Sequence, residues 1–277
     1  MDNIFPLVSV VMAVYNGEET VSDAIESMQR QTWQDWEFII IDDASTDKTN
    51  EVLQSRSSHD TRIRVFRNKT NKGLGASLNV GWKLARGSLI ARMDADDISL
   101  PTRLQKQVDF LKRNNDVTVL GTGIIVKNKE GEIVGQVSRP SSHAELRNQI
   151  LYKVPFFHPT VMMRKKFLED SGGYNEKFLR AQDYELWSRS IDKACYANLL
   201  EPLLQYTTTE KQTFKSIFWG AYAIYRAATL HGAWIQRLFC PVRFFASSIA
   251  SCLGVRSISL KRAAFQDQRA SKFKVMS

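Results

Sequence analysis

The chain alternates between short apolar runs and amphipathic segments over its first hundred residues. Four runs rich in β-branched residues predict buried strands, at 7–14, 37–42, 62–66 and 87–93. The segments between them repeat apolar residues every three or four positions and predict helices. Strands that alternate with helices build parallel sheets from βαβ units, so we predict an α/β fold with a mostly parallel central sheet flanked by helices.

The pattern stays mixed in the second half. Runs at 117–126 and 132–137 flank a polar turn and predict a hairpin. Ser142 and Glu145 have the spacing of a helix capping box, as do Thr20 and Asp23. The remaining predicted elements are a loop and strand over 156–164, a helix from 165 to the Gly-Gly pair at 172–173, a helix from 181 and a final strand over 195–200.

Polar residues follow three of the predicted strands, and in parallel sheets ligands bind at such strand ends. The residues are Tyr15 with Asn16, Asp42 with Asp43, and Asp94 with Asp96 and Asp97. Three carboxylates within four residues repel one another, and a hard divalent cation such as Mg²⁺ or Mn²⁺ would relieve that repulsion. We therefore predict a metal and diphosphate site here, with a solvated strand-end turn as the alternative.

Other side chains near these strand ends have two roles open to them. Asp43 can accept a hydrogen bond from a base or a ribose, or it can cap the next helix, a structural role that we expect of Asp42. Tyr15 can stack on a base or pack on the rim of the sheet. Lys72 and Arg92 suit contact with a diphosphate. The alternatives are a surface cation for Lys72 and an ion pair with the acidic cluster for Arg92.

Two candidates lie further along the chain. Asp183 follows the Gly-Gly turn at a predicted helix start, where it can act as a general base or simply stabilise the helix dipole. His158, in the sequence His-Pro-Thr, can bind a metal or a diphosphate as a neutral imidazole, or it can be a structural residue.

Composition narrows the classes of function. The 277 residues suit one large α/β domain or a domain with an appendage. Cys195, Cys240 and Cys252 are too far apart for a metal pair or a disulfide framework, and the start of the chain lacks the features of a signal peptide. These features favour a reducing, cytoplasmic setting. No GxxxxGK[ST] or GxGxxG sequence occurs, which argues against the common ATPase and dinucleotide-binding classes.

The net positive charge of the chain comes entirely from the C-terminal segment. Residues 211–277 contain 11 Lys and Arg and one acid, whereas residues 1–210 contain 27 Lys and Arg and 28 acids. We therefore divide the chain into a body, 1–210, and a basic, aromatic extension, 211–277, for which we predict amphipathic helices on an anionic membrane surface. The alternative is a helical subdomain packed on the body or on a second subunit of a homo-oligomer. No recognition motif supports nucleic-acid binding.

Taken together, the motifs resemble those of family 2 glycosyltransferases, which have the GT-A fold. The resemblance covers about residues 6–205, with every block in order. The matching blocks are Val-Ser-Val-Val-Met-Ala-Val-Tyr-Asn at 8–16, Gln-Thr-Trp at 31–33, Ile-Asp-Asp-Ala-Ser-Thr-Asp at 41–47, Asn-Lys-Gly-Leu at 71–74, Arg-Met-Asp-Ala-Asp-Asp at 92–97 and Gln-Asp-Tyr-Glu-Leu-Trp at 182–187.

The resemblance implies an inverting, metal-dependent transferase that extends a surface glycan on a saccharide or lipid-linked acceptor, working on the inner face of the cell membrane. The donor would be a nucleotide sugar, usually a UDP-sugar. Its contacts would come from Ala13, Tyr15, Asp43, Lys72, Arg92, Asp94 and Ala95. Mn²⁺ or Mg²⁺ would be held by Asp94 and Asp96, with Asp97 and His158 as further candidate ligands.

Asp183 would be the general base in this family. Gln182 stands where members more often have Glu, and Ala13 stands where some have a hydroxyl residue. Two alternatives remain, a sugar nucleotidyltransferase and a non-catalytic nucleotide-sugar-binding protein. The nucleotidyltransferase would need a Gly-rich, basic signature after the first strand, and an intact set of aspartates argues against the non-catalytic protein.

Overall fold

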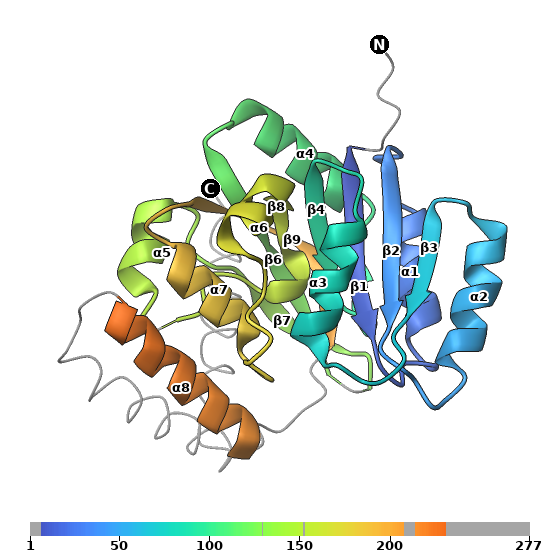
Figure 1. Ribbon diagram of the computed structural model, residues 1–277. Helices are drawn as coiled ribbons and strands as arrows, with labels where there is room; N and C mark the ends of the chain where they lie inside the picture. Colours follow the sequence, from blue (N-terminus) through green and yellow to red (C-terminus); the bar gives the residue numbers. More distant parts are fainter. Residues whose placement is uncertain (1–6, 129, 152, 208–213, 231–277) are drawn as a thin grey trace. The chain divides into compact units, whose positions relative to one another are not determined.

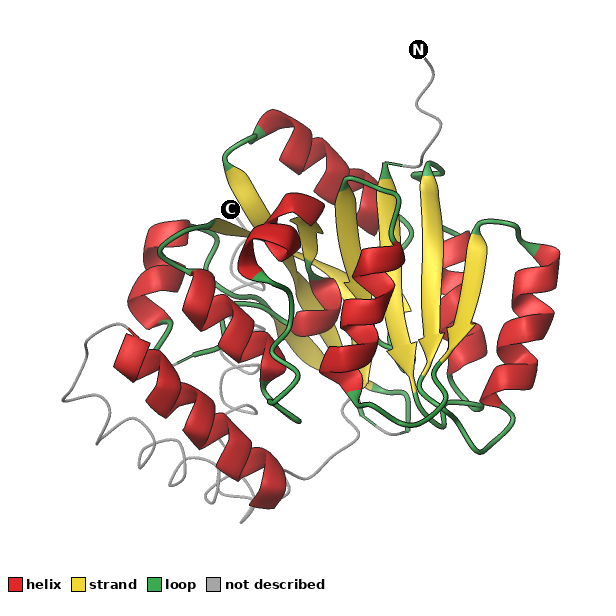
Figure 2. Ribbon diagram, viewed as in Figure 1, coloured by secondary structure: helices red, strands yellow, loops and turns green. Residues whose placement is uncertain are grey.

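The computed structural model describes residues 7–128, 130–151, 153–207 and 214–230, and the chain separates into two units, 1–208 and 209–277. The first unit is built on a nine-stranded sheet of order β3-β2-β1-β4-β8-β6-β9-β5, with β7 paired to β6. Helices lie on both faces of this sheet (Figures 1 and 2). A layered arrangement of this kind buries the central strands from both sides.

The strands of the described residues comprise eight that the sequence predicted and β5, which it did not, and β9 ends well beyond its predicted bound. They are β1 (Val8–Val14), β2 (Trp36–Asp42), β3 (Ile63–Arg67), β4 (Leu89–Met93), β5 (Ile98–Ser99), β6 (Val117–Lys127), β7 (Ile133–Val137), β8 (Met162–Arg164) and β9 (Cys195–Thr207). The helices of the first unit are α1 (Val21–Gln29), α2 (Thr49–His59), α3 (Leu74–Leu84), α4 (Arg103–Arg113), α5 (His143–Gln149), the 3₁₀ turn η1 (His158–Thr160), α6 (Lys165–Ser171) and α7 (Gln182–Ser190).

The strand directions agree with the prediction of a mostly parallel sheet. Strands β1 to β4 are mutually parallel, and β8 runs antiparallel to both β4 and β6. Because β9 is parallel to β6, while β5 and β7 are antiparallel to their partners, the strands β1, β2, β3, β4, β6 and β9 all point the same way. Their carboxyl ends therefore lie at one edge of the sheet.

The core explains why the first strands could be recognised in the sequence. Every residue of β2 and β4 is buried, and β1 has only one that is not fully buried. Helix α1 packs the side chains of Val21, Ile25 and Met28 against this sheet. Burying each such side chain is worth about 1.5–3 kcal/mol, so these strands and helices stabilise one another.

Three local predictions meet different outcomes. Ser142 caps α5 by accepting from the Glu145 backbone N–H, and its hydroxyl donates to the Glu145 carboxylate (2.6 Å), so the predicted helix cap is confirmed. The capping box at Thr20 is wrong: the backbone there is αR (φ −118°, ψ −29°) and the side chain makes no capping bond, because a cap needs an extended residue. Strand β9 runs to Thr207, seven residues beyond the prediction, where it pairs with β6 and β5.

The second unit is described only through helix α8 (Phe214–Leu230). The predicted helical character is confirmed for this stretch, and the rest of the predicted extension lies outside the described residues. Among the helices that the structure describes, none is long and apolar enough to span a bilayer.

Candidate functional site

The ends of β1, β2 and β4 meet at one edge of the sheet, as the sequence predicted. The Asp43 backbone N–H donates to the Val14 carbonyl (2.8 Å), which ties the end of β2 to the end of β1. On the other side of β1, a Cβ placed on Gly17 would lie 3.8 Å from the Cβ of Ala95. The turn after β1 is thus flanked by Asp43 and by the Asp94–Asp97 segment.

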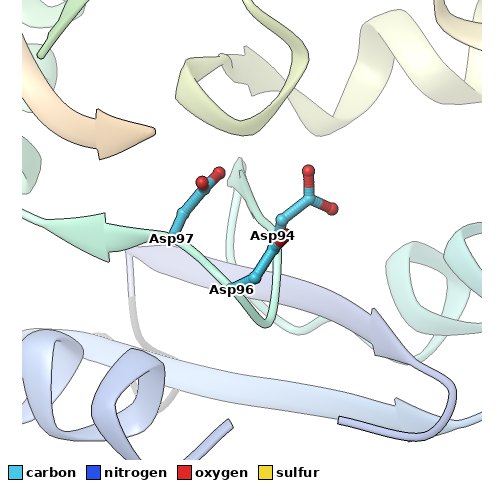
Figure 3. A group of neighbouring side chains, drawn as sticks. All are labelled: Asp94, Asp96 and Asp97. Carbon is cyan, nitrogen blue, oxygen red and sulfur yellow. The ribbon is translucent and has the colours of Figure 1, made fainter. Parts of the chain in front are cut away.

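Asp94, Asp96 and Asp97 form one cluster in the turn from β4 to β5 (Figure 3). Each offers a carboxylate oxygen, and the three oxygens lie within 4.8 Å of one another. Neither oxygen of the 1% exposed Asp97 receives a well-formed hydrogen bond from the described residues. Buried carboxylate oxygens without a well-formed hydrogen bond suit a hard cation such as Mg²⁺ or Mn²⁺ once they are ionised.

Burial, together with the neighbouring Asp94 and Asp96 carboxylates, raises the pKa of Asp97 to about 8. The opposing contributions come from Arg92 and from the Thr207 backbone N–H. Near neutral pH the metal-free cluster therefore keeps a proton on Asp97. A bound cation would compete with that proton for the same oxygens.

Arg92 lies on β4 beside this cluster, is 2% exposed, and forms an ion pair with Asp94. Burial opposes its charge, but the ion pair outweighs burial and raises its pKa, so Arg92 is a cation. Its Nε and Nη1 groups have no hydrogen-bond partner among the described residues. The ion pair with the acidic cluster, which was the alternative role for Arg92, is present, and two nitrogens remain for an anionic ligand.

Arg103 supports Arg92 from α4 and had no role in the sequence-based prediction. Its Nη2 donates to the Arg92 carbonyl (2.7 Å), and its other nitrogens donate to Ser99 and Gln107 (3.1 Å each). Burial lowers the pKa of this fully buried guanidinium to about 9. An arginine near a helix start normally indicates a solvated residue, so only the fold could identify this support.

A cavity of about 570 Å³ connects the cluster with the second half of the chain. Its lining includes Arg92 and Asp94 from β4 and the turn after it, Asp183 from α7 and Tyr206 from β9. Asp183 borders this cavity but is otherwise surrounded by protein. Burial raises the pKa of its carboxyl, and the nearby Asp94 adds to the shift. The predicted metal ligand and the predicted base thus face one cavity.

His158 lines the same cavity but does not belong to the carboxylate cluster. Its Nε2 makes a hydrogen bond with the Tyr174 hydroxyl (2.8 Å). Desolvation, together with the nearby Arg92, lowers its pKa well below the usual value, so the imidazole is neutral. The neutral state agrees with the prediction, whereas its role as a metal ligand finds no support in this arrangement.

The Asp43 carboxylate accepts more hydrogen bonds from the protein itself than the sequence suggested. Its Oδ1 accepts hydrogen bonds from the Asn68 side chain (2.7 Å) and the Lys72 backbone (2.9 Å), and its Oδ2 accepts one from Gly73 (2.8 Å). Asp42 has the structural role expected of it, since it accepts a bond from Ser45 (2.8 Å). Asp43 therefore shapes the loop before α3, and contact with a nucleotide remains a prediction for it.

The other predicted donor contacts lie around the same edge. Tyr15 is 50% exposed and Lys72 is exposed, whereas Ala13 and Ala95 are partly buried. Tyr206, which the sequence did not single out, lies near the cluster, and burial together with Asp97 raises its pKa to about 12. It was missed because the predicted final strand stopped before it.

Backbone strain is concentrated at this site. In the described residues the non-glycine positions with positive φ are Asn16 (52°), Ala44 (63°) and Ala181 (56°). Each lies within two residues of a candidate side chain: Tyr15, Asp43 or Asp183. Such a conformation costs roughly 1–2 kcal/mol for an alanine and less for an asparagine, so contacts with the surrounding structure must hold these turns in place.

Comparison with known proteins agrees with this geometry. Residues 9–172 match the family model described as glycosyl transferase family 2. The O-antigen biosynthesis glycosyltransferase WbnJ of Escherichia coli is 34% identical over 230 residues, which cover 82% of this chain and 87% of that protein. The E. coli UDP-Gal:α-D-GlcNAc-diphosphoundecaprenol β-1,3-galactosyltransferase is 30% identical, with 81% and 82% covered.

A solved structure agrees at the level of the fold. The mannosyltransferase PcManGT from Pyrobaculum calidifontis, in complex with GDP-Man and Mn²⁺, aligns with a TM-score of 0.62 at 16% identity, covering 97% of this chain and 81% of that one. The predicted GT-A fold is therefore confirmed. From the family match and from relatives that align over most of its length, we conclude that the chain belongs to glycosyl transferase family 2.

Proposed function

We propose that this protein is an inverting glycosyltransferase that moves a sugar from a nucleotide sugar to a hydroxyl group of a saccharide or lipid-linked acceptor. The observation that carries the proposal is the single cavity bordered by both Asp94 and Asp183. A donor diphosphate near Asp94 and an acceptor hydroxyl near Asp183 would then lie on opposite sides of the transferred sugar, as a single in-line displacement requires.

Asp183 would act as the general base. It takes the proton of the acceptor hydroxyl, whose oxygen attacks the anomeric carbon while the bond to the diphosphate breaks and its electron pair leaves with the nucleotide. The raised pKa of Asp183 supports this role, because a stronger base accepts the proton more readily once it is ionised. One displacement inverts the anomeric configuration.

Arg92 would bind the leaving diphosphate through its unpaired Nε and Nη1 groups. The oxygens of Asp94, Asp96 and Asp97 are suited to hold Mg²⁺ or Mn²⁺, which when bound supplies Lewis-acid stabilisation of diphosphate charge. Arg103 would keep Arg92 in place by its bond to the Arg92 carbonyl.

For the donor we propose a UDP-sugar and for the acceptor a glycan on a lipid carrier, reached from the cytoplasmic side of the membrane. The E. coli galactosyltransferase, whose name gives both a UDP-sugar and a diphosphoundecaprenol acceptor, supports this choice. The GDP-Man complex of the structural neighbour makes a GDP-sugar the main competing donor.

The test is a screen of purified protein with Mn²⁺ against UDP-, GDP- and dTDP-sugars, measuring the release of nucleoside diphosphate. We expect release from at least one UDP-sugar and none from Asp94→Asn. Release from GDP- or dTDP-sugars alone would contradict the UDP assignment. Release of pyrophosphate from a sugar phosphate and UTP would instead identify a nucleotidyltransferase.

A further inference from the structure

Helix α8 buries a face made mostly of alanine and exposes larger aromatic and apolar side chains, whereas an ordinary amphipathic helix exposes polar ones. The buried residues are Ala221, Ala223, Ile224, Ala227 and Ala228. The exposed large residues are Phe218 (57%), Tyr222 (39%), Tyr225 (46%) and Leu230 (54%). Scattered exposed apolar residues are normal on a surface, but here they follow one another along a single helix.

The spacing places the exposed rings on one side of the helix. Phe218, Tyr222 and Tyr225 are four and three positions apart, so at 3.6 residues per turn they fall within an arc of about 60°. Trp219 extends this surface, since its ring makes edge-to-face contacts with Phe218 (centroids 6.1 Å apart) and Tyr222 (6.0 Å). We call Phe218, Tyr222 and Tyr225 the aromatic face of α8.

The charge of the segment indicates what covers this face. The sequence of α8 contains Lys215 and Arg226 and no acid, and residues 211–277 as a whole contain 11 cations and one acid. A second copy of the segment would bring the same excess of positive charge. An anionic lipid surface would bring the opposite charge, at roughly 1 kcal/mol per cation near the surface.

We propose that the aromatic face of α8 binds the surface of an anionic lipid bilayer, with the helix lying in the plane of the membrane. Tyrosine and phenylalanine suit the boundary between headgroups and acyl chains, and the tyrosine hydroxyls stay hydrated there. Arg226, which is exposed, would reach the headgroup phosphates. The described residues that line the cavity of the proposed transferase all belong to the first unit, so this face would add a separate binding partner.

The test is flotation of the full-length protein with two kinds of vesicle, pure phosphatidylcholine and phosphatidylcholine mixed with phosphatidylglycerol. The test variant is Phe218→Ala/Tyr222→Ala/Tyr225→Ala. The matched control is Ile133→Ala/Val134→Ala on β7, where the two side chains are 63% and 55% exposed. The control removes exposed apolar groups from another place in the molecule.

We expect wild type and control to float with the anionic vesicles and the triple variant to bind them about 100-fold more weakly, at about fivefold per ring. Arg226→Gln should weaken binding to anionic vesicles alone, by about fivefold. Circular dichroism should show the same helix content in all variants, because the replaced side chains are exposed.

Three results would overturn the proposal. The first is flotation of the triple variant equal to that of wild type, and the second is failure of wild type to bind the anionic vesicles. The third is a wild-type dimer that the triple variant converts to monomers in size-exclusion chromatography without vesicles, which would assign the face to a second copy. Nucleotide release by a variant that no longer floats would leave the proposed transferase intact, so the two proposals fail separately.

Discussion

The replacement Asp97→Asn tests whether the buried carboxylate destabilises the metal-free fold and serves as a cation ligand. The asparagine keeps the shape of the side chain and removes its charge. In the metal-free protein the pKa of Asp97 is about 8, against 3.8 for an ordinary aspartate. Keeping the Asp97 carboxyl of the folded protein protonated at pH 7 then costs roughly 4 kcal/mol, because the same group is ionised in the unfolded chain. We treat this as the upper limit of the stabilisation that the asparagine gains, because an amide needs no proton.

The sign of the pH dependence follows from the same shift. Since the folded-state pKa lies above the unfolded one, the folded protein holds more protons between about pH 4 and pH 8. The contribution of Asp97 to the stability of metal-free wild type therefore falls as pH rises through that window. Asp97→Asn should remove most of this fall and raise the melting temperature at pH 7 by several degrees, at about 2–4 °C per kcal/mol.

The assay is thermal unfolding in EDTA and in excess Mn²⁺, followed by circular dichroism from pH 5 to pH 8. Mn²⁺ at a hundred times its dissociation constant should stabilise wild type by about 2.7 kcal/mol and the variant by much less. Asp96→Asn is the matched control, since Asp96 is less buried and its loss should weaken the Mn²⁺ effect with little gain in EDTA. A variant that is less stable than wild type in EDTA would refute the reasoning.

Two further predictions concern Ala181 and Asp183. Ala181→Gly should raise the unfolding free energy by about 1 kcal/mol in a urea titration, because glycine adopts φ 56° without strain; the control Ala24→Gly, inside α1, should lower it by a similar amount. For the wild-type enzyme, kcat/KM should fall with decreasing pH at a midpoint above 3.8, because burial raises the pKa of Asp183, which must be ionised to accept a proton. A pH profile that is flat down to pH 4 would exclude that assignment.

The parts of the fold that the sequence predicts are those fixed by local pattern. Strands β1, β2 and β4 are buried almost throughout, so each appears as a continuous apolar run. Strand β5 has two residues and no period, and it exists only because it pairs with β9. The predicted end of β9 came too early because exposed residues at 200–201 and Pro202 interrupt a strand that continues beyond them.

The candidate site follows the same division. The acids at the strand ends could be predicted because parallel topology brings strand ends together. The hydrogen bonds that Asp43 makes with the loop at 68–73 could not be predicted, because their donors include backbone N–H groups about 30 residues away. Arg103 was missed for a similar reason, since its role depends on a hydrogen bond to the Arg92 carbonyl that only the fold brings within reach.

The central claim is that Asp183 performs the chemistry while the Asp94 side of the cavity holds the donor. The most direct test compares Asp183→Asn with wild type in two measurements, sugar transfer to acceptor and UDP binding by calorimetry in the presence of Mn²⁺. We predict that transfer falls by at least a thousandfold while the dissociation constant for UDP changes less than threefold. Transfer at a rate near that of wild type would contradict the account.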